Sequence, residues 1–366
     1  MTSGAFMNEI NDSAIDSAEQ FSLRGKAVAY MRAMALVEWT PHCDMDFTAA
    51  WPDLVYTAGA RYRGLPYVNF RNSSLEEFSA FIDEEGVYAG PAAWTGCAGV
   101  DCSSAVLAAW GAISSSFDYV WSLPMMQYAV PVGDYTIPEG FSAREEATSC
   151  EVIALNDRQT IYKAYAQLQP GDAVVKYKTA GHVRMICERP VVFYDDNGGI
   201  DDTSYVTAHE ITVPVFEHCG YKTSWKIDTP FSFADLHKTD YLPVTCKELI
   251  ENKAEEPALS IDYPNSAMSI RNNGGFAGLL QSNYRIFMVE AVIRDKSGNI
   301  IRQPVEYPAN AVDLRMVSKS YDLARLNSEL DIGGLGTGNY TLTLSAKTAG
   351  QNMIVYETIF EAKELA

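Results

Sequence analysis

The sequence predicts an α+β fold in which a helix that begins at a cysteine packs on an antiparallel sheet, followed by an all-β domain. Three observations lead to this prediction. The stretch "GVDCSSAVLAAWG" at residues 99–111 is apolar and suits a helix. Strand-like segments follow it between residues 172 and 216. Beyond residue 258, short strand-like segments alternate with turn signals.

Composition and charge exclude several classes of protein. The chain has 366 residues, of which 47% are hydrophobic and 11% aromatic, so it is a folded globular protein long enough for two or three domains. Its formal net charge of −19 argues against nucleic acid and anionic membranes as partners, because both require a basic surface. No run of apolar residues approaches the ~20 residues of a membrane span.

The chain divides into three parts. Residues 1–50 are predicted to be an N-terminal helical extension, because residues 13–39 have helical spacing and a Thr-Pro pair follows. Residues 51–252 form the α+β domain, with a long loop-rich stretch between the cysteine helix and the strands. The polar segment "ENKAEEPA" is a linker. Residues 258–366 are predicted to be an immunoglobulin-like β-sandwich, which contains neither cysteine nor histidine and is therefore a poor place for catalysis.

The N-terminus and the cysteines bear on the compartment and on metal binding. The first twenty residues lack a basic start followed by an apolar run, so they do not form a signal peptide. Seven cysteines are present, and no pair has CxxC spacing, so neither a zinc site nor a thioredoxin-like site is expected. An odd number leaves at least one thiol free.

Cys102 is the candidate nucleophile. A thiol attacks as thiolate, and a helix N-terminus or a neighbouring imidazole is expected to lower its pKa. His182 is the candidate base, because it opens a strand after a Pro-Gly-Asp turn, where a sheet packed on the cysteine helix would bring it near the thiol. The alternative is that Asp101 and Ser103 only cap the helix and that Cys102 is an ordinary buried cysteine.

Several motifs together resemble the NlpC-type cell-wall cysteine peptidases, which have a papain-like fold. The matching segments are "GLPYV" at residues 64–68, "DCS" at 101–103, "LQPGD" at 168–172 and "GHV" at 181–183. Ser104 replaces the glycine usual in the family, and Asn69-Phe70 replaces its Trp-Gly-Gly. The resemblance covers residues 60–215.

The resemblance implies a function and a site. It implies a cysteine hydrolase that cleaves an amide bond in a peptidoglycan stem peptide, beside D-glutamate or a diamino acid, with no metal or organic cofactor. Cys102 and His182 would be catalytic, and Tyr67, Asp101 and Ser103 would contact substrate. A secreted or cell-envelope protein whose leader has been removed is expected, with a cytoplasmic protein as the alternative.

Two other functions remain open. The same fold hosts amidases and acyltransferases that act on lipid or small-molecule amides, and these would have an apolar, tunnel-like cleft. A wall-binding protein without catalysis is the second alternative, although the cysteine and histidine argue against it.

A third group must orient the histidine, and two neighbours compete for the role. His209 and Glu210 lie in one strand-like segment, so their side chains point to opposite faces. The face of His209 is slightly more apolar, and burial alone favours His209 pointing inward. Relatives with a similar segment have a glutamate at the position of Glu210, and a carboxylate holds one imidazole tautomer and stabilises the imidazolium. Glu210 is therefore the preferred candidate, and His209 is the alternative.

Overall fold

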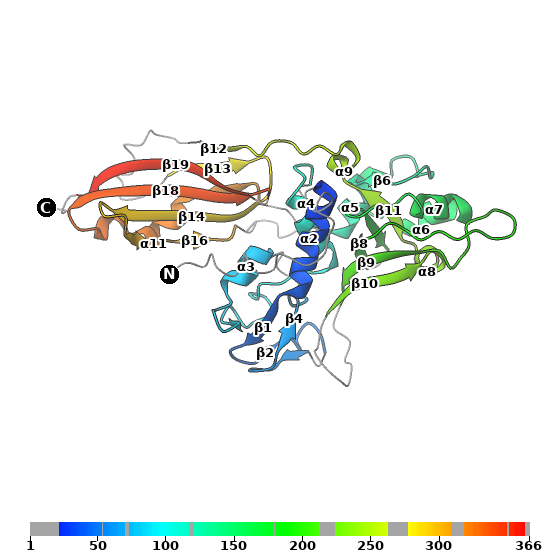
Figure 1. Cartoon of the computed structure of the whole chain (residues 1–366), viewed down its shortest axis with the longest axis horizontal. Helices are drawn as coiled ribbons and strands as arrows, with labels where there is room; N and C mark the ends of the chain where they lie inside the picture. Colours follow the sequence, from blue (N-terminus) through cyan, green and yellow to red (C-terminus); the bar gives the residue numbers. More distant parts are fainter. Residues whose placement is uncertain are drawn as a thin grey trace.

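The computed structural model describes residues 22–52, 54–69, 73–117, 121–178, 180–212, 224–262, 277–308, 318–349 and 351–362. This part of the chain has a mixed α+β fold with nine α-helices and several sheets, as the sequence predicts at this level. Figure 1 shows an elongated molecule with β12–β19 at one end and the larger, mixed part at the other. No helix in the described ranges is long and apolar enough to cross a membrane.

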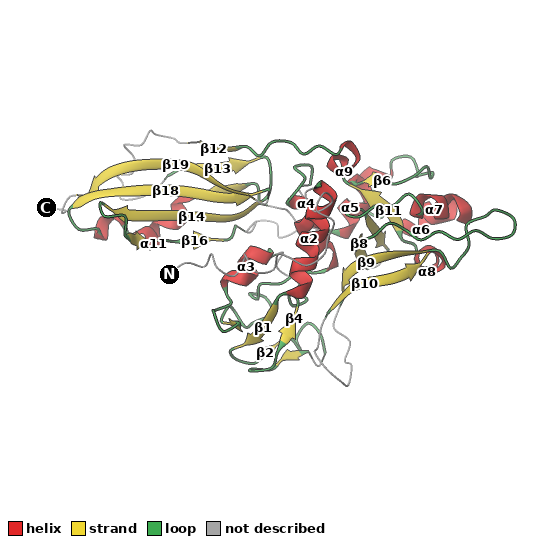
Figure 2. Cartoon of the chain, viewed as in Figure 1, coloured by secondary structure: helices red, strands yellow, loops and turns green. Residues whose placement is uncertain are grey.

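The larger part is built on a six-stranded antiparallel sheet with the order β10-β9-β8-β7-β11-β6. Helix α4 packs against β8 of this sheet, and α2 contacts α4 from a distant part of the chain (Figure 2). The strands are β6 (Val130–Pro131), β7 (Ala173–Tyr177), β8 (Gly181–Ile186), β9 (Tyr205–Ile211), β10 (Trp225–Ser232) and β11 (Leu242–Thr245).

The helices of the larger part are mostly short, and several were not predicted. Residues 121–165, expected to be mainly loop, contain three of them. Helices of seven or eight residues are marginal alone and form through tertiary packing, so their sequences carry little periodic signal. The helices are α2 (Leu23–Leu36), α3 (Leu75–Ala80), α4 (Cys102–Gly111), α5 (Ser122–Tyr128), α6 (Ser149–Leu155), α7 (Arg158–Tyr165), α8 (Phe233–Lys238) and α9 (Lys247–Glu251).

The N-terminal helix is shorter than the sequence suggests. Ser22 caps α2 by accepting a hydrogen bond from the backbone N–H of Gly25, and the helix ends at Leu36. Trp39 was expected in the helix but lies in a strand, where its indole donates to the carbonyl of Gly64 over 2.9 Å. Its ring packs among buried aromatic side chains, and this burial favours strand pairing over another helical turn. Residues 13–21 of the expected helix lie outside the described ranges.

Small sheets surround that aromatic cluster. β1 pairs with β4 and β5, and β2 pairs with β3. Buried residues of α2, β1 and β2 belong to the same hydrophobic core as Cys102, so residues 22–50 are packed into the larger part. The strands are β1 (Glu38–Pro41), β2 (Met45–Asp46), β3 (Val55–Tyr56), β4 (Tyr62–Arg63) and β5 (Val87–Tyr88).

The C-terminal part consists of two antiparallel sheets around a second hydrophobic core. One sheet has the order β12-β13-β17; the other has the order β15-β14-β18-β19, with β16 paired to β14. The short helix α11 (Asn327–Leu330) lies in a connection. The strands are β12 (Leu259–Asp262), β13 (Leu279–Ser282), β14 (Ile286–Asp295), β15 (Ile300–Arg302), β16 (Val305–Glu306), β17 (Ser320–Asp322), β18 (Gly338–Thr348) and β19 (Gln351–Ala362).

The two parts contact each other through a mixed polar and aromatic interface. Lys347 of β18 forms an ion pair with Glu76 of α3 over 2.8 Å, and Tyr30 of α2 donates a hydrogen bond to the same carboxylate. The ring of Tyr30 also packs against Phe287. Both ionic side chains are largely buried, so loss of either partner would leave the other charge without compensation.

Candidate active site

Cys102 is the first residue of α4, and the residues around it form a cap. The Asp101 carboxylate accepts a 2.7 Å hydrogen bond from the backbone N–H of Ser104, and the Ser104 hydroxyl accepts one from Asp101 in return. The hydroxyl of Ser103 donates to the same carboxylate. Ser104, which departs from the family pattern, thus completes a capping box. Capping therefore accounts for all three neighbours of Cys102, and the substrate contacts expected of Asp101 and Ser103 stay a prediction.

The "GLPYV" segment lies directly against the start of this helix. Val68 donates a backbone hydrogen bond to Val100, and Val100 donates one to Pro66. This pairing places Tyr67 close to the start of α4. Burial raises the pKa of the tyrosine hydroxyl, and its electrostatic interactions with Cys102 and Asp101 raise it further. The substrate contact expected of Tyr67 stays a prediction.

The Pro-Gly-Asp turn connects the sheet to helices α4 and α2 through hydrogen bonds. Trp110 of α4 donates its indole N–H to the carbonyl of Gly171 over 2.7 Å. The buried Asp172 carboxylate accepts hydrogen bonds from Arg24 of α2 and Thr245 of β11. Gly171 has a φ of +87°, a conformation that a glycine adopts without strain. The turn therefore sets where β7 and β8 lie relative to Cys102.

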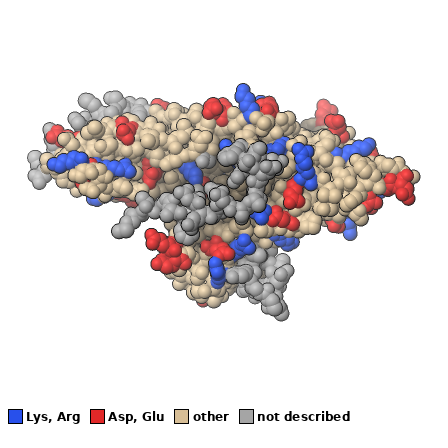
Figure 3. Space-filling model, viewed as in Figure 1, with Lys and Arg blue, Asp and Glu red and all other residues tan. Residues whose placement is uncertain are grey.

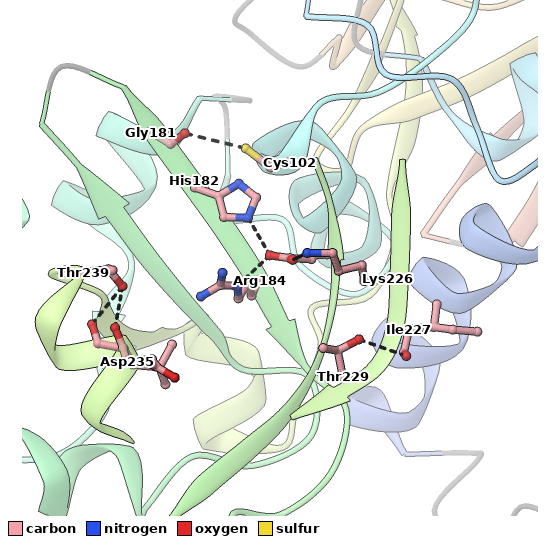
Figure 4. Close-up of polar contacts among 11 residues, drawn as sticks. Cys102, Gly181, His182, Arg184, Lys226, Ile227, Thr229, Asp235 and Thr239 are labelled. Atoms are coloured by element: carbon pink, nitrogen blue, oxygen red, sulfur yellow. Dashed lines mark hydrogen bonds and ion pairs between the residues drawn. The ribbon is translucent and has the colours of Figure 1, made fainter. Parts of the chain in front are cut away.

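His182 of β8 and Glu210 of β9 are in direct contact. The distance between His182 Nε2 and a Glu210 carboxylate oxygen is 2.8 Å, and Glu210 is 1% exposed. Figure 4 shows the His182 ring just below the Cys102 thiol. A bond from Nε2–H to a carboxylate leaves the lone pair on Nδ1, the nitrogen on the other side of the ring. The thiol itself lies 4.0 Å from the carbonyl oxygen of Gly181.

Gly181, which precedes His182, has a steric role. A Cβ atom at this position would collide with the hydroxyl of Ser122 in α5. The glycine therefore allows α5 to pack closely beside the strand that carries the histidine.

His209 lies on the other face of the sheet, as the strand alternation predicts. It is wholly buried, like Glu210, so burial does not distinguish the two neighbours. Its Nδ1 accepts a hydrogen bond from the backbone N–H of Asp228, and it makes no described contact with His182. Of the two candidates for the third group, the structure brings only Glu210 to His182.

Two cationic residues at the site were missed by the sequence analysis. Arg184 Nε donates a 2.6 Å hydrogen bond to Glu210, and its guanidinium lies 3.8 Å from the centre of the Phe231 ring. Lys226 of β10 forms an ion pair with the other oxygen of Glu210 over 3.2 Å. Arg184 is two residues beyond His182, so alternation placed it on the same face and offered a signal. The sequence offered no such signal for Lys226, because the pairing of β10 with β9 was not predicted.

These contacts set the charges of the histidine and the carboxylate. Although burial opposes it, the hydrogen bond from His182 and the charge of Arg184 lower the pKa of Glu210 to about 2, so Glu210 is ionised at neutral pH. Burial lowers the pKa of His182, with Arg184 and Lys176 adding to the effect and Glu210 opposing it. The imidazole is therefore neutral at rest and able to accept a proton.

The pKa of the Cys102 thiol is higher than the sequence analysis predicts. Burial and the neighbouring Asp101 raise the pKa of Cys102, and the backbone N–H groups of Val183 and of the helix start offset only part of this. The expected lowering was wrong because it considered the helix terminus and the histidine but not the loss of water around a thiol that is 5% exposed. The resting pair is a thiol and a neutral imidazole.

Alkylation at several pH values tests this resting state. We expect the rate of Cys102 labelling by iodoacetamide to keep rising as the pH increases above neutral, because only the thiolate reacts. The rate is measured by mapping labelled peptides, with the half-buried Cys43 as an internal comparison. A constant rate from weakly acid to alkaline pH would contradict the neutral pair and indicate a thiolate–imidazolium pair.

Of the other described histidines, His42 and His237 have neighbours outside this site. His42 Nδ1–H donates a hydrogen bond to the carbonyl of Tyr88, and the His237 ring packs edge-on against Tyr162. His218 and Cys219 lie outside the described residues. Acidic and basic side chains are interspersed over the coloured part of the face shown in Figure 3.

No protein-family model matches the chain, and a search of curated proteins finds no significant match.

Proposed function

We propose that the protein is a cysteine hydrolase of papain-like architecture that cleaves an amide bond. The proposal rests above all on one observation: the Cys102 sulfur lies 4.0 Å from the carbonyl oxygen of Gly181, the residue before His182, while His182 Nε2 is 2.8 Å from the Glu210 carboxylate (Figure 4). A nucleophile, a base and a group that orients the base are the elements of nucleophilic acyl transfer. Their placement at a helix start and on two adjacent antiparallel strands supports the papain-like assignment.

The proposed reaction begins when Cys102 Sγ attacks the substrate carbonyl. His182 Nδ1 takes the thiol proton in the same step, so a preformed thiolate is not required. The backbone N–H groups of Cys102 and Ser103, the first two of α4, lack partners within the helix and are suited to stabilise the oxyanion. The imidazolium then protonates the leaving amine, and water hydrolyses the thioester with His182 as base. Glu210 holds the Nε2–H tautomer and stabilises the imidazolium.

The proposed substrate is a peptide of the bacterial cell wall. The support is the set of motifs shared with the NlpC-type peptidases, two of which have structural counterparts at the site. The "GLPYV" segment lies against the helix start, and the Pro-Gly-Asp turn anchors the strands that carry the base. The basic groups Lys176, Arg184 and Lys226 near His182 suit a substrate with carboxylate groups, within a chain of net charge −19.

Digestion of purified muropeptides tests the proposal. Mass spectrometry of the products is expected to show cleavage of a stem peptide with a new amine, and no cleavage with Cys102→Ala. A panel of N-acyl amides run in parallel would identify an acyl-chain amidase instead. Tight muropeptide binding without turnover of either panel would contradict hydrolysis and support a wall-binding role.

Removal of the C-terminal part is expected to preserve catalysis. A chain ending near Glu255 retains every candidate catalytic group, so hydrolysis of a small soluble substrate should continue. We expect a lower melting temperature, because Glu76 and Tyr30 lose Lys347 and Phe287 as partners. Activity and thermal unfolding are measured on both chains. A folded truncated chain without activity would show that the C-terminal part helps to build the site.

A further inference from the structure

Three potential metal ligands lie together on the face of the sheet opposite Glu210. Cys187 directly follows β8, His209 belongs to β9, and Asp228 belongs to β10. One ligand atom from each lies within 4.8 Å of the other two. The Cys187 sulfur is 3.8 Å from Asp228 Oδ1, and His209 Nδ1 is 3.9 Å from the same oxygen. The cluster takes no part in the proposed hydrolysis.

The backbone of β10 departs from regular geometry at this cluster. The pairing of β10 with β9 shifts register between Lys226 and Thr229, and Asp228 in the gap has a φ of +50°. An irregularity of this kind re-aims a side chain that would otherwise follow the strand alternation. Here it places the Asp228 carboxylate beside His209 and Cys187.

His209 is prepared to act as a ligand. It is wholly buried, and the backbone N–H of Asp228 donates to Nδ1 over 3.2 Å, so the lone pair on Nδ1 faces the cluster and the proton is on Nε2. Among the described residues, Nε2 has no hydrogen-bond partner. A fully buried imidazole held by one long hydrogen bond is free to exchange that bond for a cation.

We propose that Cys187, His209 and Asp228 form a binding site for a divalent cation of the zinc class. Thiolate, imidazole and carboxylate are the ligand types that zinc prefers, whereas magnesium and calcium prefer oxygen alone. A tetrahedral zinc holds such ligand atoms about 3.3–3.6 Å apart. The two spacings to Asp228, 3.8 and 3.9 Å, therefore need to close by roughly half an ångström, and the Cys187–His209 spacing, which is at most 4.8 Å, by up to about one ångström. The fourth position would belong to solvent. The site is independent of the proposed function.

A hollow in the surface gives a cation access to the cluster. Its volume is about 600 Å³, and Asp228 belongs both to its lining and to the cluster. Three of the lining side chains are carboxylates, which attract cations. The lining residues are Glu188, Tyr205, Thr207, Asp228, Pro230, Ser232 and Asp235.

One neighbouring group competes with the cation. Arg32 of α2 lies 2.9 Å from both oxygens of Asp228, but both side chains are 40% exposed, so this ion pair is weak. The Cys187 thiol loses its proton to solvent when its sulfur binds the metal. Affinity therefore rises with pH, because protons compete with the metal for the sulfur.

Titration with Co²⁺ tests the site on the full chain carrying Cys102→Ser, which removes the active-site thiol. We expect one Co²⁺ per chain, a thiolate-to-cobalt charge-transfer band in the near ultraviolet, and loss of the band when Zn²⁺ is added. Cys187→Ser should abolish the band and weaken binding by more than about 100-fold, the upper range for loss of an outer-shell partner. Cys43→Ser is the matched control, because Cys43 is a half-buried free thiol outside the cluster.

A second variant keeps all three ligands and reverses the expected effect. Arg32→Gln removes the competing cation, so Co²⁺ should bind several-fold more tightly. An unchanged band in Cys187→Ser, equal loss in Cys43→Ser, or a folded chain that binds no Co²⁺ would each overturn the proposal. Because the readout is metal binding, failure of the hydrolase proposal would leave this result unaffected.

Discussion

Cys102→Ala is expected to lower turnover of a cleavable amide substrate by at least about four powers of ten, to the level of the background reaction. The substitution removes the nucleophile, and no other cysteine described in the structure contacts His182. The loss is measured as kcat by product analysis, with circular dichroism to check folding. The small change in volume at a capped helix start should leave the fold intact.

The matched control for this prediction is Cys97→Ala. Cys97 is also a buried cysteine and precedes the same helix, and its sulfur contacts the Tyr88 hydroxyl. We expect it to retain kcat with some loss of stability. Comparable losses in both variants would show that Cys102 acts only through packing, which is the alternative that the sequence left open.

Glu210→Gln is expected to lower kcat by roughly two or more powers of ten, equivalent to about 2.7 kcal/mol in activation free energy. The amide cannot stabilise the imidazolium and can present its N–H₂ to His182, which favours the wrong tautomer. The acid limb of the pH–activity profile should also move to lower pH. Glu210 raises the pKa of His182 against burial, so removing the negative charge lowers that pKa further.

His209→Asn separates the catalytic role from burial. The side chains of His209 and Glu210 are both buried on the same strand, but only Glu210 contacts His182. We expect His209→Asn to cost stability while changing kcat much less than Glu210→Gln and leaving the acid limb in place. If steady-state kinetics showed the reverse pattern in folded proteins, the orienting role would belong to His209.

Most features of the site that the sequence predicts come from short-range sequence patterns. A polar cap before an apolar stretch indicated a helix that starts at Cys102, because capping is a local interaction. A turn motif followed by a strand placed His182, and strand alternation put His209 and Glu210 on opposite faces. The α+β fold class and the strands of the C-terminal part followed from periodicities of the same short range.

Long-range contacts decided the rest. The choice of Glu210 on structural grounds depended on the register of β9 with β8, which brings its carboxylate to His182 across 28 residues. The protonation of Cys102 depended on burial by surrounding elements, which outweighs the favourable helix terminus.

The chain's local chemistry therefore determined which side chains were available for catalysis: a capped cysteine, a histidine at a strand start and two candidate partners. Only the tertiary structure decided which of them meet and in which charge state. It also gathered Cys187, His209 and Asp228, whose spacing in the sequence matches no metal motif. The physical reason is that register, bulges and burial arise from packing between distant segments, and such packing has no local signature.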